Sequence, residues 1–259
     1  MKNTLFFVVF TIILAMGLPA APFSFSAGGG GLMGYTFTRY TLEANGSLDP
    51  IIPGNINSTQ TMDRVNYGGF LFFDATYGVA AVSLRGGKNS YEEKLKQKLA
   101  GGSWFSISDD TGTGTETALG LSLLGKYPFR VTEKITLFPL AGVEYQIALT
   151  EKRQPKGDAV HDRTKGDLPA DQDQDGNSYP LSAWNTLTID LGAGLDCQIK
   201  GPLFLRNELL FSFRLQTPYE TGAKDMTAHQ FHASNIKLGG LTGGPTLRIS
   251  LGYRFTDRD

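Results

Sequence analysis

The sequence predicts an all-β protein, specifically an eight-stranded antiparallel up-and-down transmembrane β-barrel with four long external loops. Three observations predict this fold. Apolar and polar residues alternate with a period of two in eight separate segments. Short and long connections between these segments alternate strictly, as in barrels that have short turns at one end and long loops at the other. The N-terminus has the composition of an export signal.

The export signal occupies the first residues of the chain. Lys2 precedes an apolar stretch from Leu5 to Leu18, and small residues and prolines follow. This order predicts a signal peptide over 1–26 and a barrel domain over 27–259, with cleavage after Ala20 as an alternative. A second alternative is an uncleaved helical anchor, although the stretch is shorter than the roughly 20 residues that a helix needs to cross a bilayer.

Each predicted strand has one apolar face and one polar face. Leu205 and Leu209, for example, alternate with Arg206 and Glu208. A charged residue on the lipid face near the bilayer midplane costs about 2–4 kcal/mol, so the charged face is assigned to the barrel interior. The predicted strands are 31–43, 64–74, 78–87, 115–127, 135–150, 184–199, 203–216 and 246–255.

The connections between the strands fix the up-and-down topology. Within one long connection, helical spacing of Tyr91, Leu95 and Leu99 predicts a short helix over 91–100. A soluble exported β-sandwich would show the same alternation with its polar face outside, and it is an alternative. The short connections are 75–77, 128–134 and 200–202, and the long ones are 44–63, 88–114, 151–183 and 217–245.

The last predicted strand carries a family resemblance. The segment Thr246–Phe255 reads TLRISLGYRF, and it is similar to the last strand of bacterial outer-membrane barrels, which the barrel-assembly machinery binds. Four residues follow Phe255, where those barrels usually end on the aromatic residue. With the export signal and the eight-strand pattern, the chain resembles small outer-membrane barrels of the OmpA, OmpX and OmpW type.

The resemblance implies a location and a range of roles. It implies residence in outer-membrane lipid, with the loops extracellular and both termini periplasmic. It also implies a role as a narrow pore, an adhesin or a small enzyme, and does not choose among them.

The first candidate site is a set of charged residues predicted to face the lumen. An eight-stranded interior is just wide enough for side chains to fill, and buried charges need partners. The set is expected to form either a polar core that closes the barrel or a narrow polar conduit. Its members are Glu144, Asp190, Asp196, Arg206, Glu208, Arg214, Arg248 and Arg254, with Arg85 and Lys126 on earlier strands.

The second candidate site is an acidic segment in the third long connection. Asp171, Asp173, Asp175 and Asn177 match the first half of a calcium-binding loop, in which oxygen ligands alternate around a tight turn. Ser182 stands at the twelfth position, where such loops have a glutamate. The segment is therefore expected to bind Ca²⁺ weakly or to be a solvated acidic loop.

The third candidate is His232-Ala233-Ser234-Asn235 in the last long connection. This segment resembles the catalytic segment of outer-membrane lipid A deacylases, which implies His232 as the base and Ser234 as the nucleophile. No Asp or Glu follows before Asp257, and the segment is predicted to lie in a loop. A coincidental match is the simpler interpretation.

Together these features favour a non-enzymatic outer-membrane barrel. The leading hypothesis is a narrow pore for small solutes or a structural surface protein. The alternative is a non-conducting adhesin or ligand-binding barrel whose external loops are ordered by calcium, and a deacylase-like enzyme comes third. The net charge of -1 argues against a nucleic-acid partner, and the single cysteine excludes an intrachain disulfide.

Overall fold

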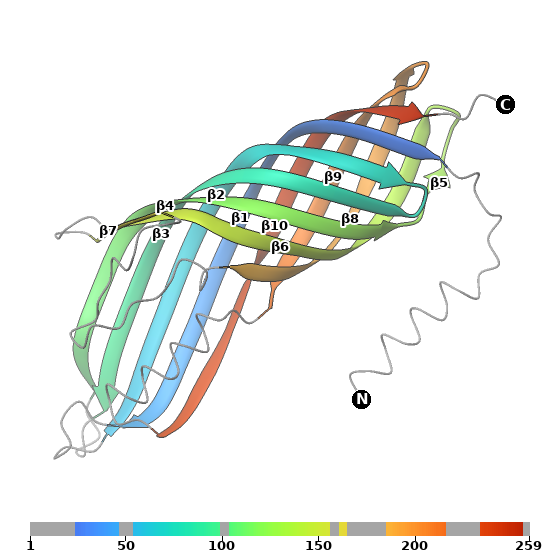
Figure 1. The fold of residues 1–259 in the computed structure, drawn as a ribbon. Helices are drawn as coiled ribbons and strands as arrows, with labels where there is room; N and C mark the ends of the chain where they lie inside the picture. Colours follow the sequence, from blue (N-terminus) through green and yellow to red (C-terminus); the bar gives the residue numbers. More distant parts are fainter. Residues whose placement is uncertain are drawn as a thin grey trace, which may run out of the picture.

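The computed structural model describes residues 24–46, 54–98, 104–155, 161–164, 185–215 and 234–255. In these residues ten strands form one antiparallel sheet, and pairing of β4 with β6 closes it into a ring (Figure 1). The ring strands are β1 (Phe25–Gly46), β2 (Gly54–Ala75), β3 (Gly78–Lys98), β4 (Trp104–Lys126), β6 (Ile135–Pro155), β8 (Thr186–Lys200), β9 (Leu203–Arg214) and β10 (Ser234–Phe255).

The ring is an up-and-down barrel, as predicted. Strands that follow one another around the ring also follow one another in the chain, and β1 pairs with β10 from Phe25↔Phe255 onward. Turns at 76–77, 127–134 and 201–202 lie at the end of the barrel that we call the short-turn end, and Gly201 takes the positive φ of 54° that its turn requires. The opposite end is called the far end. Two short strands, β5 (Phe129–Arg130) and β7 (His161–Thr164), pair with β6.

Several strands are longer than the sequence predicted. β1, β2, β4 and β10 begin well before their predicted starts, and β3 runs on to Lys98. Two of the four predicted long loops, 44–63 and 88–114, therefore consist largely of strand. The predicted helix over 91–100 is wrong, because residues up to Lys98 pair with β2 on one side and β4 on the other. Backbone pairing along both edges outweighs the weak local helix preference.

The outer surface of the barrel is a continuous apolar belt. Large outward side chains are well exposed, among them Leu71 at 70 %, Leu123 at 64 % and Met33 at 61 %. At the short-turn end the rings of Tyr77 and Tyr127 stack at 6.2 Å, as expected at a membrane interface. An apolar outside and a charged inside describe a membrane-spanning barrel, so the alternative of a soluble sandwich is wrong.

The wall is taller than a membrane requires. A 22-residue strand such as β1 is about 70 Å long and, at a tilt of about 40°, rises about 55 Å, against an apolar band of about 25 Å. The extra height lies on one side: β9 ends at Arg214, whereas β10 continues beside β1 as far as Ser234 (Figure 1). No helix within the described ranges has the length and apolar character to cross a bilayer.

Candidate functional site

The short-turn half of the lumen is organised around Arg206 on β9. Its guanidinium donates to both oxygens of Asp196, with Nε–Oδ1 at 2.7 Å and Nη2–Oδ2 at 2.8 Å, and also pairs with Asp74. Lys126 Nζ lies 2.6 Å from Asp74 Oδ2. All four side chains are nearly inaccessible to solvent. Two cations therefore neutralise two carboxylates in this half of the lumen.

Aromatic rings hold the Arg206 guanidinium from the sides. Its central carbon lies 4.7, 5.0 and 5.2 Å from the ring centroids of Phe72, Phe138 and Phe204. Inward glycines make room for two of these rings, since a Cβ at Gly194 would meet Phe138 at 2.1 Å and one at Gly252 would meet Phe204 at 2.2 Å. Cation–π contacts of this kind are stronger when the cation is desolvated, so Arg206 is fixed in place.

The far half of the lumen is organised around Glu144 on β6. Its carboxylate accepts from Arg248 at 2.8 Å, from Gln146 at 2.7 Å and from Arg85. Glu144 is 2 % exposed and Arg248 is 1 % exposed. The Phe70 ring lies 5.5 Å from the Arg248 guanidinium. One carboxylate oxygen, Oε2, thus accepts from two arginines.

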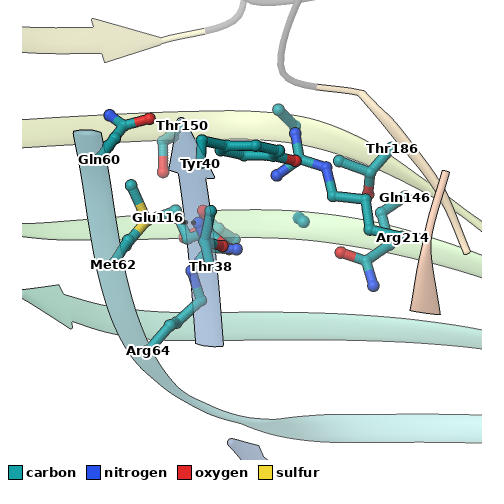
Figure 2. A pocket seen from close by; sticks show the side chains of 13 residues that line it. Thr38, Tyr40, Gln60, Met62, Arg64, Glu116, Gln146, Thr150, Thr186 and Arg214 are labelled. Atoms are coloured by element: carbon teal, nitrogen blue, oxygen red, sulfur yellow. Dashed lines mark hydrogen bonds and ion pairs between the residues drawn. The ribbon is translucent and has the colours of Figure 1, made fainter. Parts of the chain in front are cut away.

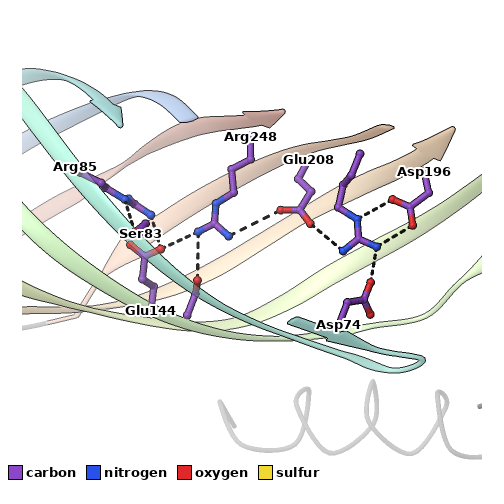
Figure 3. A network of polar contacts seen from close by, with 9 residues as sticks. Asp74, Ser83, Arg85, Glu144, Asp196, Glu208 and Arg248 are labelled. Carbon is purple, nitrogen blue, oxygen red and sulfur yellow. Dashed lines mark hydrogen bonds and ion pairs between the residues drawn. The ribbon is translucent and has the colours of Figure 1, made fainter. Parts of the chain in front are cut away.

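Glu208 lies between the two halves. Its Oε1 is 3.9 Å from Arg206 Nη1, and its Oε2 is 3.8 Å from Arg248 Nη1. Figure 3 shows Glu208 between the Arg248 and Asp196 ends of the network. We call the whole set the charge ladder: Arg85, Glu144, Arg248, Glu208, Arg206, Asp74, Asp196 and Lys126.

The structure places the remaining predicted lumen residues beside the ladder. Asp190 is buried and accepts from Thr188 Oγ1 at 3.0 Å. Arg254 is about one-third exposed and lies 3.9 Å from Asp196 at the short-turn end. Arg214 lies apart from the ladder and lines a cavity at its far end. Asp74 is a further lumen residue that was not among the predicted ones, although its position one residue after the outward Phe73 indicates an inward side chain.

A cavity of about 40 Å³ with a mixed polar and apolar lining lies in the lumen beside Gln146, and Figure 2 shows the side chains that line it. Arg64 and Glu116 form an ion pair of 2.6 Å in its wall. Gln146 also lines the cavity and donates to Glu144, so it connects the cavity to the ladder. A cavity of this volume has room for one or a few water molecules and is too small for a solute.

The other two candidate sites lie largely outside the described residues. The acidic segment with Asp171, Asp173, Asp175 and Asn177 falls in the gap between 164 and 185, as does His232 in the gap between 215 and 234. Ser234 is the first residue of β10, so its predicted loop position is wrong. Across the described residues, no three His, Cys, Asp or Glu side chains are grouped to hold a metal ion.

Comparisons with known proteins give structural matches alone. No family model matches the chain, and no curated protein matches it. The outer membrane protein OprG from Pseudomonas aeruginosa matches with a TM-score of 0.44 and 9% identity, over 90% of this chain and 95% of that one. Neisserial surface protein A matches at 0.33 and 9%, over 86% and 97%.

An enzyme is also among the matches. The outer membrane protease OmpT from Escherichia coli matches at 0.30 and 7%, over 93% and 99%. Since all these TM-scores lie below 0.5, the fold assignment stands on the strand pairing of this chain. That pairing and the outward belt make the chain a small transmembrane β-barrel, and the three solved structures named above are outer-membrane or surface proteins with which it shares this fold.

Proposed function

We propose that the protein is an outer-membrane barrel whose lumen is a narrow polar conduit for small ions, closed at rest by the charge ladder. The short-turn end faces the periplasm and the tall wall faces outward. The proposal is carried by one observation: charged side chains from β2, β3, β4, β6, β8, β9 and β10 meet along the lumen and form a connected series.

The chemistry of the ladder favours a conduit over a plain plug. Buried ion pairs are expensive to desolvate, and apolar side chains of similar volume usually fill a core at no loss of stability. The same lumen already holds apolar side chains such as Leu124, Phe138 and Leu210. If the barrel needed only a closed core, apolar side chains could fill the whole lumen. Fixed charges of both signs, in contrast, let ions pass once the ion pairs between them break.

Conductance of the refolded full chain in planar bilayers tests this proposal. Wild-type protein is expected to give rare, brief openings. Glu144→Gln is expected to open far more often, because an amide cannot neutralise Arg85 and Arg248, which then repel one another. The matched control is Glu116→Gln, which breaks the ion pair with Arg64 beside the cavity and leaves the ladder intact.

The recordings distinguish a conduit from a closed core. Openings that become more frequent in Glu144→Gln but not in Glu116→Gln support the conduit. Silence from both wild type and Glu144→Gln, with folding shown by resistance to unfolding in cold detergent gels, rules the conduit out.

A second function is favoured by the height of the wall. β1 to β4 and β10 carry a paired sheet well past the apolar belt, and a rigid scaffold of this kind suits display of ligand-binding loops. In this alternative the barrel is an adhesin or ligand-binding surface protein, and Ca²⁺ orders the acidic segment through Asp171, Asp173, Asp175 and Asn177. Calcium titration followed by intrinsic tryptophan fluorescence tests it, and a response that persists in Asp173→Asn contradicts it.

A further inference from the structure

Four buried polar atoms without a hydrogen-bond partner belong to Glu208 and to three residues beside it on β9 and β10. The register of β9 and β10 sets Glu208 opposite Arg248 and Arg206 opposite Ser250. Within the described part of the chain, Glu208 Oε2, Arg206 Nη1, Arg248 Nη1 and Ser250 Oγ accept or donate no hydrogen bond. All four residues are at most 3 % exposed. A buried polar group left without a partner is costly, so this set is built to bind something.

Glu208 is the most loosely held carboxylate of the ladder. Its two arginine contacts of 3.9 and 3.8 Å exceed the roughly 2.7–2.9 Å of a charge-assisted hydrogen bond. Asp196 and Glu144 bind their arginines at 2.7 and 2.8 Å. Glu208 is therefore held by the field of two cations and not by direct hydrogen bonds to them.

The two arginines are held by other groups. Asp196 and three aromatic rings fix Arg206, as described above, and Glu144 with Phe70 fixes Arg248. Their Nη1 donors therefore keep their positions whether or not Glu208 lies between them. Two guanidinium donors lie on either side of the Glu208 carboxylate, and the strand register places the buried Ser250 hydroxyl opposite Arg206 and two residues from Arg248. Donors of this kind bind small anions.

We propose that Arg206, Arg248 and Ser250 form a binding site for a small monovalent anion, a carboxylate or a halide, and that the Glu208 carboxylate is its tethered occupant. The site takes one anion at a time, because a second negative charge so close would repel the first. The binding of an anion at this site does not depend on the proposed conduit. Only the further expectation that anions pass through the lumen rests on the proposed function.

Chemical rescue of Glu208→Ala tests the site. Removing the side chain leaves space and three donors, and formate can supply the missing carboxylate. Thermal unfolding of the refolded full chain is measured in sodium formate and in sodium chloride and sodium sulfate of equal ionic strength. Formate is expected to stabilise the variant saturably, raising its folding equilibrium constant about elevenfold at ten times the Kd. Chloride is expected to do so more weakly and sulfate, being divalent and larger, not at all.

Asp190→Ala is the matched control. Asp190 is equally buried, on the neighbouring strand β8, but its carboxylate has no Arg or Lys within 4.0 Å among the described residues and accepts from a threonine hydroxyl instead. Formate should therefore not stabilise this variant beyond the effect of ionic strength. If Glu208→Ala refolds poorly, its refolding yield in formate against chloride replaces the thermal measurement, with the same expectation.

Each outcome decides between the two proposals. A folded Glu208→Ala that responds equally to formate and sulfate overturns the anion site, even if the bilayer recordings show openings. Specific rescue by formate with silent bilayers keeps the site and removes the conduit. Where both hold, the reversal potential of Glu208→Ala in a chloride gradient should show preference for anions, and a preference for cations would contradict the inference.

Discussion

Replacement of Arg206 by methionine should destabilise the barrel severely. Methionine has a similar length and no charge, so the Asp196 carboxylate keeps its burial and loses its direct cation, with only Arg254 left at 3.9 Å. Asp74 retains Lys126 at 2.6 Å. Breaking a buried pair in this way costs about 3–5 kcal/mol. At about 1.4 kcal/mol per decade, the folding equilibrium constant should fall by a factor of roughly 10² to 10³ or more.

The double variant Arg206→Met with Asp196→Asn separates lost charge balance from lost packing. It removes the uncompensated carboxylate, so it should recover at least half of the stability lost in the single variant. The measurement is urea unfolding in lipid vesicles, followed by tryptophan fluorescence and extrapolated linearly to water. A loss of less than about 1 kcal/mol in the single variant would show that Arg206 does not hold the Asp196 charge. Additive effects of the two substitutions would show the same, because residues in one ion-pair network should couple.

The lipid belt, the extended β3, the export signal and Ser234 can each be tested directly. Leu71→Arg, on the lipid belt, should cost about 2–4 kcal/mol in the same unfolding assay, whereas Ser90→Arg, outward on β3 beyond the belt, should cost close to nothing. The amide of Tyr91 should exchange slowly with deuterium, as a strand amide paired with β2 does, and exchange at the rate of a surface helix would contradict the extended β3. Mass spectrometry of the exported protein should place cleavage after residue 20 and not after 26, because Phe25 already belongs to β1 and stacks on β2. Ser234→Ala should leave the acylation of lipid A unchanged, and a change in acyl chain number would revive the deacylase hypothesis.

The alternation of the later strands was enough to predict the barrel. Charges on one face and aliphatic residues on the other leave little choice of orientation for β8, β9 and β10. The alternation of apolar and polar residues does not reveal a strand where successive side chains have similar polarity. The glycines of 28–31 show no alternation although they form the middle of β1's membrane half, and the polar residues over 54–63 hide the first half of β2.

The partners of the lumen charges could not be predicted from the sequence. Arg206 and Asp74 come from β9 and β2, which are three strands apart around the ring and meet only across the lumen. Such contacts depend on the width of the closed barrel and on the reach of each side chain. The alternation of apolar and polar residues along a strand predicts which way a side chain points, but not which residue it meets across the lumen. Arg214 faces the lumen as its period predicts, and there it lines the cavity together with Gln146.

The pairing of β1 with β10 also has a kinetic consequence. The first and last described strands form one long seam, from Phe25↔Phe255 to Asn45↔Ser234, so β1 waits for its partner until the chain has been synthesised past Phe255. Until then β1 exposes an unpaired edge of the kind that promotes aggregation. Contacts between residues so distant in sequence form slowly. Closure of this seam is therefore the step at which the barrel most depends on help from the cell.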